Sequence, residues 1–305
     1  MSNLTSEVVQ DCSTISDCSA LKLIIKPKNK DLGGFSVRRT LPTSACRSVG
    51  PWVFFDHMGP AHFEKNHGID VRPHPHIGLA TVTYLFTGEM LHRDSLGSNV
   101  RVLPGDINLM IAGRGIVHSE RQRDEIKSKP HNIHGLQLWL ALPSELEQTD
   151  PGFFHYSKKE IPEAKTDSVP VRVLMGSAYG VTSPVKTLSE TLYIEARLKT
   201  GQSLVLPNAD EKALYVIEGE LALLDTTLDE HNMGVFTDEP GITVTAQRDT
   251  TLVIIGGKSV GKRYMEWNFV ASDKSLIEQA KADWQAGRFA KVPGDEQEFI
   301  PLPEE

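Results

Sequence analysis

Short runs of apolar and β-branched residues, each closed by a turn signal, dominate the first half of the chain. Residues 79–86 are rich in β-branched and aromatic side chains and are followed by Thr87-Gly88-Glu89. Further apolar runs, separated by turns rich in Gly and Pro, occupy 100–103, 107–112, 116–120 and 135–142. Strands this short and regular are typical of an all-β sandwich or barrel, and they leave little room for the helices of βαβ units.

A second round of strand-like runs begins near residue 171 and includes 192–198, 213–221 and 251–255. Within it, the sequence at 215–220 (YVIEGE) echoes the sequence at 84–89 (YLFTGE). Both copies have an aromatic residue, two apolar residues, a variable residue, Gly and Glu. This weak internal repeat predicts a duplicated barrel.

These patterns give a domain organisation. We expect a polar N-terminal arm at 1–20, a first barrel at 21–145, a linker at 146–170, a second barrel at 171–270, and a C-terminal helix and tail at 271–305. Within the first barrel, 61–72 is expected to be a loop. The helix is predicted over 272–287, because Asp273 is a suitable N-cap, Ile277, Ala280 and Trp284 share one face, and Gly287 is a stop signal.

Composition and charge narrow the class of protein. The chain has 305 residues, 39% of them hydrophobic, and a formal charge of −8, so a basic surface for direct binding of nucleic acid is not expected. No run approaches the ~20 apolar residues of a membrane helix, and the N-terminus does not resemble a secretory signal. The three cysteines, Cys12, Cys18 and Cys46, are an unlikely disulfide framework, so we expect reduced thiols and a cytoplasmic protein.

The strongest chemical signal is a pair of histidines, His74 and His76, in the sequence PHPH. Residues i and i+2 of a strand point to the same face, so both imidazoles can reach one point. His118 and Glu120 have the same spacing on a later strand. Taken alone, the first pair could be loop histidines in a turn shaped by the prolines. The second pair favours a metal site with four protein ligands.

Three neutral imidazoles and one carboxylate would give a site of charge near +1 with a divalent ion. Mixed ligation of this kind with open positions is typical of non-haem Fe(II), although Mn, Ni, Co or Zn would also fit. A closed structural zinc site is disfavoured because no cysteine takes part. The second copy has residues 208–212 (NADEK) where the first has its histidine pair, so the metal is expected in the first barrel alone.

For other polar residues the sequence gives weaker evidence of a role in the metal site. Asp56 and His57 would either hydrogen-bond to metal ligands or shape the turn before Gly59-Pro60, and both interpretations stay open. The segment 92–95 (HRDS) is interpreted as a charged strand end. His131 and His134 flank the start of a strand and are not assigned to the site.

Several short segments of the sequence together resemble the pirin family, a two-domain branch of the cupins. The matching segments are 56–60, 73–76, 81–85, 92–97, 104–106, 112–120 and 134–139. The resemblance implies two stacked cupin barrels, which are double-stranded β-helices, with a short C-terminal helix. It also implies one divalent metal ion, with iron expected, held in the N-terminal barrel by His74, His76, His118 and Glu120.

Some family members have quercetin 2,3-dioxygenase activity, and the resemblance therefore implies an enzyme that opens a flavonol ring with O2. In this hypothesis Glu120, as a loosely held ligand or a nearby base, takes the proton of the substrate hydroxyl. The alternative is an iron-binding, redox-sensing regulatory protein that acts on a protein partner, in the cytoplasm or, in a eukaryote, the nucleus. The sequence departs from the family at 77–80 and 121–122, which border the expected pocket, so the substrate is the feature least readily transferred.

Overall fold

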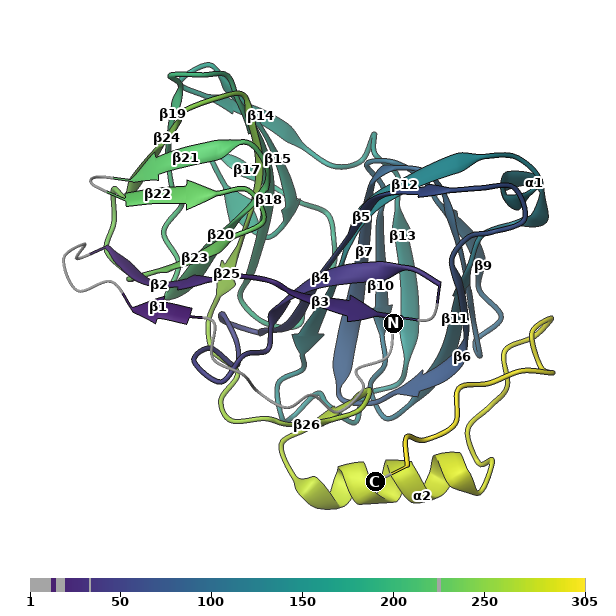
Figure 1. Cartoon of the computed structure of the whole chain (residues 1–305). Coiled ribbons are helices and arrows are strands. Elements are labelled where there is room, and N and C mark those ends of the chain that lie inside the picture. The colour runs from purple at the N-terminus through teal and green to yellow at the C-terminus, as the bar shows by residue number, and fades with distance from the viewer. Residues whose placement is uncertain (1–11, 15–19, 33, 224–225, 305) are drawn as a thin grey trace.

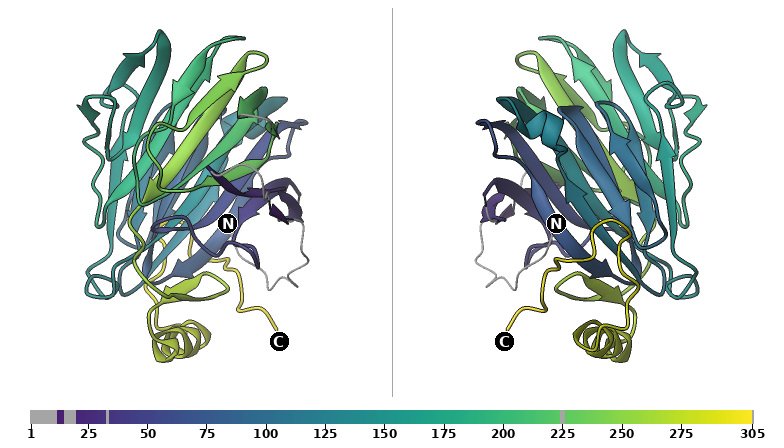
Figure 2. Two further views of the ribbon diagram at one scale, coloured as in Figure 1. Left: turned by 90° about the vertical axis from the view of Figure 1, so that its left-hand side faces the viewer. Right: turned by 90° about the vertical axis from the view of Figure 1, so that its right-hand side faces the viewer.

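The computed structural model describes residues 12–14, 20–32, 34–223 and 226–304. It consists of two β-barrels side by side, with a single longer helix, α2 (Lys274–Gln285), packed below them (Figure 1). The two side views in Figure 2 place this helix at one end of the molecule. The prediction of an all-β protein made of two cupin barrels with a short C-terminal helix is confirmed.

The first barrel is built from a seven-stranded and a four-stranded antiparallel sheet. The larger sheet has the order β13-β10-β7-β12-β5-β4-β3 and the smaller one the order β6-β11-β8-β9. Their strands are β3 (Lys28–Asp31), β4 (Ser36–Leu41), β5 (Trp52–Phe63), β6 (Asp70–His76), β7 (Leu79–Thr87), β8 (Met90–Asp94), β9 (Asn99–Val102), β10 (Ile107–Ile111), β11 (Ile116–Arg121), β12 (His131–Ala141) and β13 (Gly152–Tyr156). A four-residue helix, α1 (Asp124–Lys127), follows β11.

The second barrel repeats this plan with an eight-stranded and a four-stranded sheet, ordered β1-β2-β23-β20-β25-β18-β15-β14 and β19-β24-β21-β22. Its strands are β1 (Cys12–Thr14), β2 (Leu21–Ile25), β14 (Glu163–Thr166), β15 (Val169–Met175), β18 (Thr191–Leu198), β19 (Ser203–Val205), β20 (Glu211–Glu218), β21 (Glu220–Leu223), β22 (Thr226–Asp229), β23 (Met233–Phe236), β24 (Thr243–Ala246) and β25 (Thr250–Gly257). Two small hairpins complete the fold, β16 (Ser177–Ala178) with β17 (Val181–Thr182), and β26 (Tyr264–Glu266) with β27 (Phe269–Ala271).

Three segments differ from the sequence expectations. β2, expected to begin the first barrel, instead pairs with β23 in the second. The expected linker at 146–170 contains β13, which pairs with β10, and β14, which pairs with β15, so it adds an edge strand to each large sheet. The expected loop at 61–72 is shorter, because β5 continues to Phe63 and β6 begins at Asp70. The predicted arm at 1–20 lies largely outside the described residues, as does Cys18.

The largest hydrophobic cluster lies between the barrels rather than inside one of them. It joins Val82 and Tyr84 of β7 to Tyr193 of β18 and Tyr215 of β20. Trp52 is buried in this interface and its indole Nε1 donates to the carbonyls of Leu192 and Gly256, both at 3.1 Å. An apolar interface of this kind resists relative motion of two domains. Cys46 is half-buried at its edge, where its Sγ donates to the Ser48 carbonyl at 3.2 Å.

The predicted C-terminal helix is confirmed with its cap. The Asp273 side chain accepts a hydrogen bond from the Ser275 backbone N–H at 2.8 Å, and Ile277 and Ala280 are buried. Gly287 follows with a φ of +66°, which an L side chain rarely adopts, so the helix ends there. Among the described residues, no helix has both the length and the apolar character needed to cross a membrane.

Candidate metal centre

Two neighbouring strands of the smaller sheet bring three histidines together in the interior of the first barrel. β6 and β11 pair antiparallel, with His118 directly opposite His74, and His76 lies two residues along the same face of β6. All three side chains have no exposed surface. One ring nitrogen from each lies within 4.8 Å of the others, so His74, His76 and His118 form a candidate metal centre.

The spacing of these nitrogens suits a first-row metal ion. The Nε2 atoms of His76 and His118 are 3.1 Å apart. Imidazole nitrogens bind such an ion at about 2.0–2.1 Å, which places neighbouring ligands about 3 Å apart when the angle between them is near 90°.

Hydrogen bonds on the outer side of two rings fix the tautomer that a metal requires. His74 Nδ1 lies 2.8 Å from the Arg72 carbonyl oxygen, and His76 Nδ1 lies 3.0 Å from that of Asn268. A carbonyl oxygen only accepts, so each Nδ1 must carry the hydrogen and each Nε2 the lone pair. Both Nε2 atoms are therefore in the form that coordinates a metal.

A third such contact runs through two further residues, His92 and Asp94 of β8. His92 Nε2 is 3.0 Å from Asp94 Oδ2, and His92 Nδ1 is 3.4 Å from His118 Nδ1. Because the ionised carboxylate only accepts, His92 donates from Nε2, and a neutral His92 then accepts at Nδ1 from His118. His118 Nε2 is left with its lone pair directed at the cluster. The segment 92–95, interpreted from sequence as a strand end, thus orients a candidate ligand.

The electrostatics of the centre keep its members in the form a cation needs. Burial lowers the pKa of His76 to about 3 and lowers the pKa of His74 and His118 well below their ordinary value, so the three rings are neutral near pH 7. Burial alone would raise the pKa of Asp94, but hydrogen bonds from His92 and Ser98 outweigh it and the pKa is lowered. Asp94 is therefore the ionised end of the hydrogen-bonded series that runs through His92 to His118.

Glu120, the fourth predicted ligand, lies on the same strand as His118 but is not among the gathered ligand atoms. The register of β6 against β11 shifts between the two residues, because His74 lies opposite His118 but Val71, three positions earlier, lies opposite Glu120. β11 itself keeps a regular register against β8, so His118 and Glu120 retain the i, i+2 spacing. The Glu120 carboxylate is buried and its Oε1 accepts from Gln137 Nε2 at 3.0 Å. Gln137 Oε1 in turn accepts from Thr83 Oγ1 at 2.7 Å.

The other polar residues considered in the sequence analysis lie elsewhere. His57 faces the second barrel, where its Nδ1 is 2.9 Å from the Tyr215 hydroxyl and its Nε2 is 2.7 Å from His134 Nε2. Asp56 is paired with Arg39. Residue His131 hydrogen-bonds Gln122. No signal in the linear sequence separates these histidines from His92, because the distinction depends on which strands become neighbours.

Comparison with known proteins identifies the family. The profile of the pirin family matches residues 34–140, and that of the pirin C-terminal cupin domain matches residues 193–290. The chain belongs to the pirin family. A pirin-like protein of Caulobacter vibrioides is 43% identical over 93% of this chain and 100% of its own. The resemblance seen in the sequence is confirmed.

Solved structures of similar proteins have the same fold. A quercetin 2,3-dioxygenase from Acinetobacter baumannii superposes with a TM-score of 0.85 and 31% identity, covering 92% of this chain and 95% of that one. A bacterial pirin from Escherichia coli in complex with nickel(II) superposes with a TM-score of 0.61, covering 77% and 98%. At 18% identity the latter is evidence for the fold alone.

The residues of this pirin fit a divalent metal ion. Such a site uses neutral imidazoles as ligands, and here each of the three has a hydrogen-bond acceptor at its Nδ1. Trp139 adds a second observation. Its ring lies edge-on to His76 with centroids 5.1 Å apart, and its buried Nε1 finds no hydrogen-bond partner among the described residues. A buried donor beside the triad implies that the interior holds a polar group such as water or a ligand oxygen.

Proposed function

We propose that the protein is a metal-dependent dioxygenase that uses Fe(II) and opens the ring of a flavonol such as quercetin with O2. The observation that carries the proposal is the triad, whose three Nε2 lone pairs converge in the interior of the first barrel. The similarity to a quercetin 2,3-dioxygenase over nearly the full length of both chains supports the choice of substrate class.

In this proposal His74, His76 and His118 hold the ion. A divalent ion bound there would supply Lewis acidity toward a chelating hydroxyl and carbonyl pair, and redox chemistry toward dioxygen. The Glu120 carboxylate completes the ligand set or accepts the proton of the flavonol hydroxyl. Gln137, fixed by Thr83, orients Glu120 through a hydrogen bond and so makes its position independent of the substrate.

Access to the triad requires movement of the residues that cover it. The three imidazoles have no exposed surface, and His92, which lies against His118, is stacked on the half-buried Phe153 at a centroid distance of 4.2 Å. Phe153 is on β13, the edge strand of the larger sheet. β13 pairs with β10 on one side only, so Phe153 is held by a single strand partner.

The test uses full-length protein that has been stripped of metal and reloaded separately with Fe(II), Ni(II), Co(II) or Mn(II). Each form is mixed with quercetin in air, and flavonol absorbance and O2 uptake are followed together. The Fe(II) form is expected to consume both in equal amounts. His76→Ala should lose metal and turnover, whereas His62→Ala, at a histidine with 56% of its side chain exposed, should keep both.

Glu120→Gln separates the two roles of that carboxylate. Loss of bound metal would assign Glu120 as a ligand, whereas retained metal with turnover reduced by about 10²-fold or more would assign it as the base. The proposal fails if all four metal-loaded forms are folded and leave quercetin unchanged in air.

A further inference from the structure

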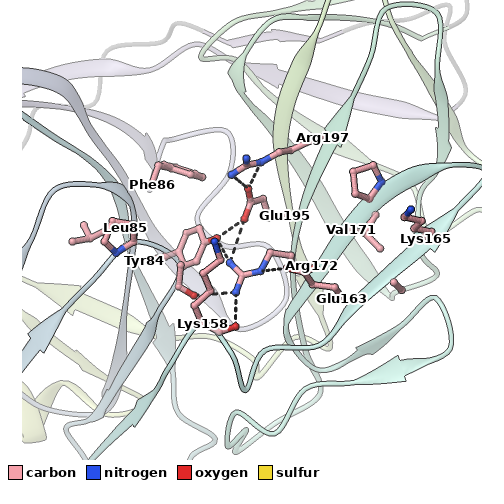
Figure 3. A pocket seen from close by; sticks show the side chains of 14 residues that line it. Tyr84, Leu85, Phe86, Lys158, Glu163, Lys165, Val171, Arg172, Glu195 and Arg197 are labelled. Carbon is pink, nitrogen blue, oxygen red and sulfur yellow. Dashed lines mark hydrogen bonds and ion pairs between the residues drawn. The ribbon is translucent and has the colours of Figure 1, made fainter.

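A cavity of about 480 Å³ lies between the two barrels (Figure 3), and none of the three histidines of the metal centre lines it. β7 contributes Tyr84 and Phe86 to its lining, and β14, β15 and β18 of the second barrel form the facing wall. Thr83, the neighbour of Tyr84, points the other way and donates to Gln137 inside the first barrel. The alternation of side chains along one strand therefore separates this cavity from the triad. Clefts of this size at domain interfaces are typical ligand sites.

A buried carboxylate anchors the cationic side chains of this cavity. Glu195 is 1% exposed, and its Oε1 accepts from Arg197 Nε at 2.8 Å and Nη2 at 2.7 Å. Its Oε2 accepts a short hydrogen bond from the Tyr84 hydroxyl. Burial, reinforced by the Glu195 charge, raises the pKa of Tyr84, so the hydroxyl stays protonated and donates. Glu195 thus holds Tyr84 and Arg197 in place, and it also forms an ion pair with Arg172 Nη1 at 3.7 Å.

Arg172 is held in a fixed orientation with one donor that makes no hydrogen bond. Its Nη1 donates to the Tyr84 hydroxyl at 2.6 Å, and its Nη2 donates to the carbonyls of Gly105 at 3.1 Å and Lys158 at 3.2 Å. Its buried Nε makes no hydrogen bond with any residue that the structure describes, although it forms an ion pair with the exposed Glu163 carboxylate at 3.6 Å. A rigid guanidinium with an unsatisfied buried donor is suited to an oxyanion.

The lining of the cavity is mainly cationic, although the protein as a whole is acidic. The chain carries a net charge of −8, yet four cationic side chains and only two carboxylates line this space. Lys158 and Lys165 are exposed at the rim. Besides Tyr84 and Gly105, the other lining residues are apolar or aromatic, namely Leu85, Phe86, Pro104, Ala164, Pro170 and Val171. A ligand of this space needs an anionic group and an apolar body together.

We propose that the interbarrel cavity binds a small aromatic carboxylate, with its oxyanion against Arg172 and the rim lysines and its ring against Phe86 and the apolar wall. The proposal depends on residues of both barrels and on none of the metal centre. Binding is therefore expected to be the same in metal-free and metal-loaded protein, and failure of the dioxygenase proposal would leave it intact.

The experiment is isothermal titration of full-length, metal-free protein with 1-naphthoate as the probe. 1-Naphthamide serves as the uncharged counterpart, and inorganic phosphate as an anion without an apolar body. We expect 1-naphthoate to bind at one site per chain, and the other two to bind at least about tenfold more weakly, because each lacks one of the two required features. Equal affinity for phosphate or for 1-naphthamide would overturn the proposed ligand class.

Two variants locate the site. Arg172→Lys keeps the charge but removes the Nε donor and the planar fork, so 1-naphthoate should bind about tenfold more weakly or worse. Lys158→Gln removes one positive charge from the rim of the cavity. It should weaken binding of 1-naphthoate by about two- to fivefold. Lys159→Gln is the matched control, because Lys159 is the next exposed lysine along the chain and does not line the cavity.

Folding of each variant is checked by circular dichroism and thermal unfolding. If Arg172→Lys does not fold, the double variant Lys158→Gln/Lys165→Gln decides, and it should weaken binding while Lys159→Gln does not. The proposal is overturned if folded variants bind 1-naphthoate as the unmodified protein does, or if His76→Ala abolishes binding and so places the probe at the metal centre.

Discussion

Replacement of His92 by phenylalanine tests whether the metal centre depends on residues behind its ligands. Phenylalanine preserves the ring that stacks on Phe153 at 4.2 Å but removes both ring nitrogens. His118 Nδ1 then loses its acceptor at 3.4 Å, and Asp94 Oδ2 loses its donor at 3.0 Å. Asp94 Oδ1 still accepts from the backbone N–H groups of Leu96 and Ser98, so the turn after β8 is expected to survive.

The magnitude follows from what His118 loses. Without an acceptor at Nδ1, the ring no longer has a preferred tautomer or orientation, and removing such an outer partner typically weakens metal binding by about 10–100-fold. That corresponds to about 1.4–2.8 kcal/mol of binding free energy. In the absence of metal, the buried Nδ1–H of His118 without an acceptor also lowers the free energy of unfolding by about 1–3 kcal/mol. The variant should therefore be less stable as well as weaker in metal affinity.

The assay is a competition titration of Fe(II) or Ni(II) against a chromophoric chelator, with thermal unfolding measured on the same samples. His62→Phe is the control, because His62 is exposed on β5 and lies on a different strand from the triad and from His92. An unchanged metal Kd in a folded His92→Phe protein would refute the reasoning that a histidine chain from Asp94 fixes the His118 tautomer.

Three further predictions concern stability. Burial raises the pKa of Glu89, but hydrogen bonds from Arg123 and Arg101 outweigh it and hold the pKa below its ordinary 4.5. This stabilisation is present above pH 4.5 and is lost as the pH falls through the folded-state pKa, so Glu89→Gln should lower the Tm at neutral pH and lower it less in acid. Trp52→Phe leaves the carbonyls of Leu192 and Gly256 without their shared donor. It should lower the free energy of unfolding by about 1–3 kcal/mol in denaturant unfolding, and an unchanged value would contradict this. Asp273→Ala removes the cap of α2 and should cost about 1 kcal/mol in the same assay, with the exposed Asp124→Ala as a control that costs less.

The sequence alone predicted those features that depend on local spacing. The alternation of side chains along a strand placed His74 and His76 on one face, and the structure confirms that they meet His118. The N-cap of α2 could be predicted for the same reason, since the Asp273 side chain reaches an N–H only two residues away. In both cases the interacting residues are neighbours in the chain or share a regular element.

Pairing between distant strands could not be predicted in this way. Leu21–Ile25 has the pattern of any strand, and its partner Met233–Phe236 lies about two hundred positions later. The role of His92 was missed for a similar reason. It depends on β8 lying beside β11, in the register that sets His92 opposite Glu120 and Asp94 opposite His118. A one-residue slip of that register would turn His92 away from the triad.

The two ends of the chain also cross between the barrels, and this arrangement gives the metal centre contributions from outside its own domain. The N-terminal β2 extends the sheet of the second barrel, while the segment after that barrel returns to cover the first (Figure 1). The Asn268 carbonyl, from this returning segment, lies 3.0 Å from His76 Nδ1 and sets the tautomer of a candidate ligand. Farther on, the Ile300 N–H donates to the Pro73 carbonyl, and Asp295 accepts from Arg121 at the end of β11. Both strands that carry the triad are therefore held from outside by the C-terminal segment, so the geometry of the metal centre is a property of the whole chain rather than of the first barrel alone.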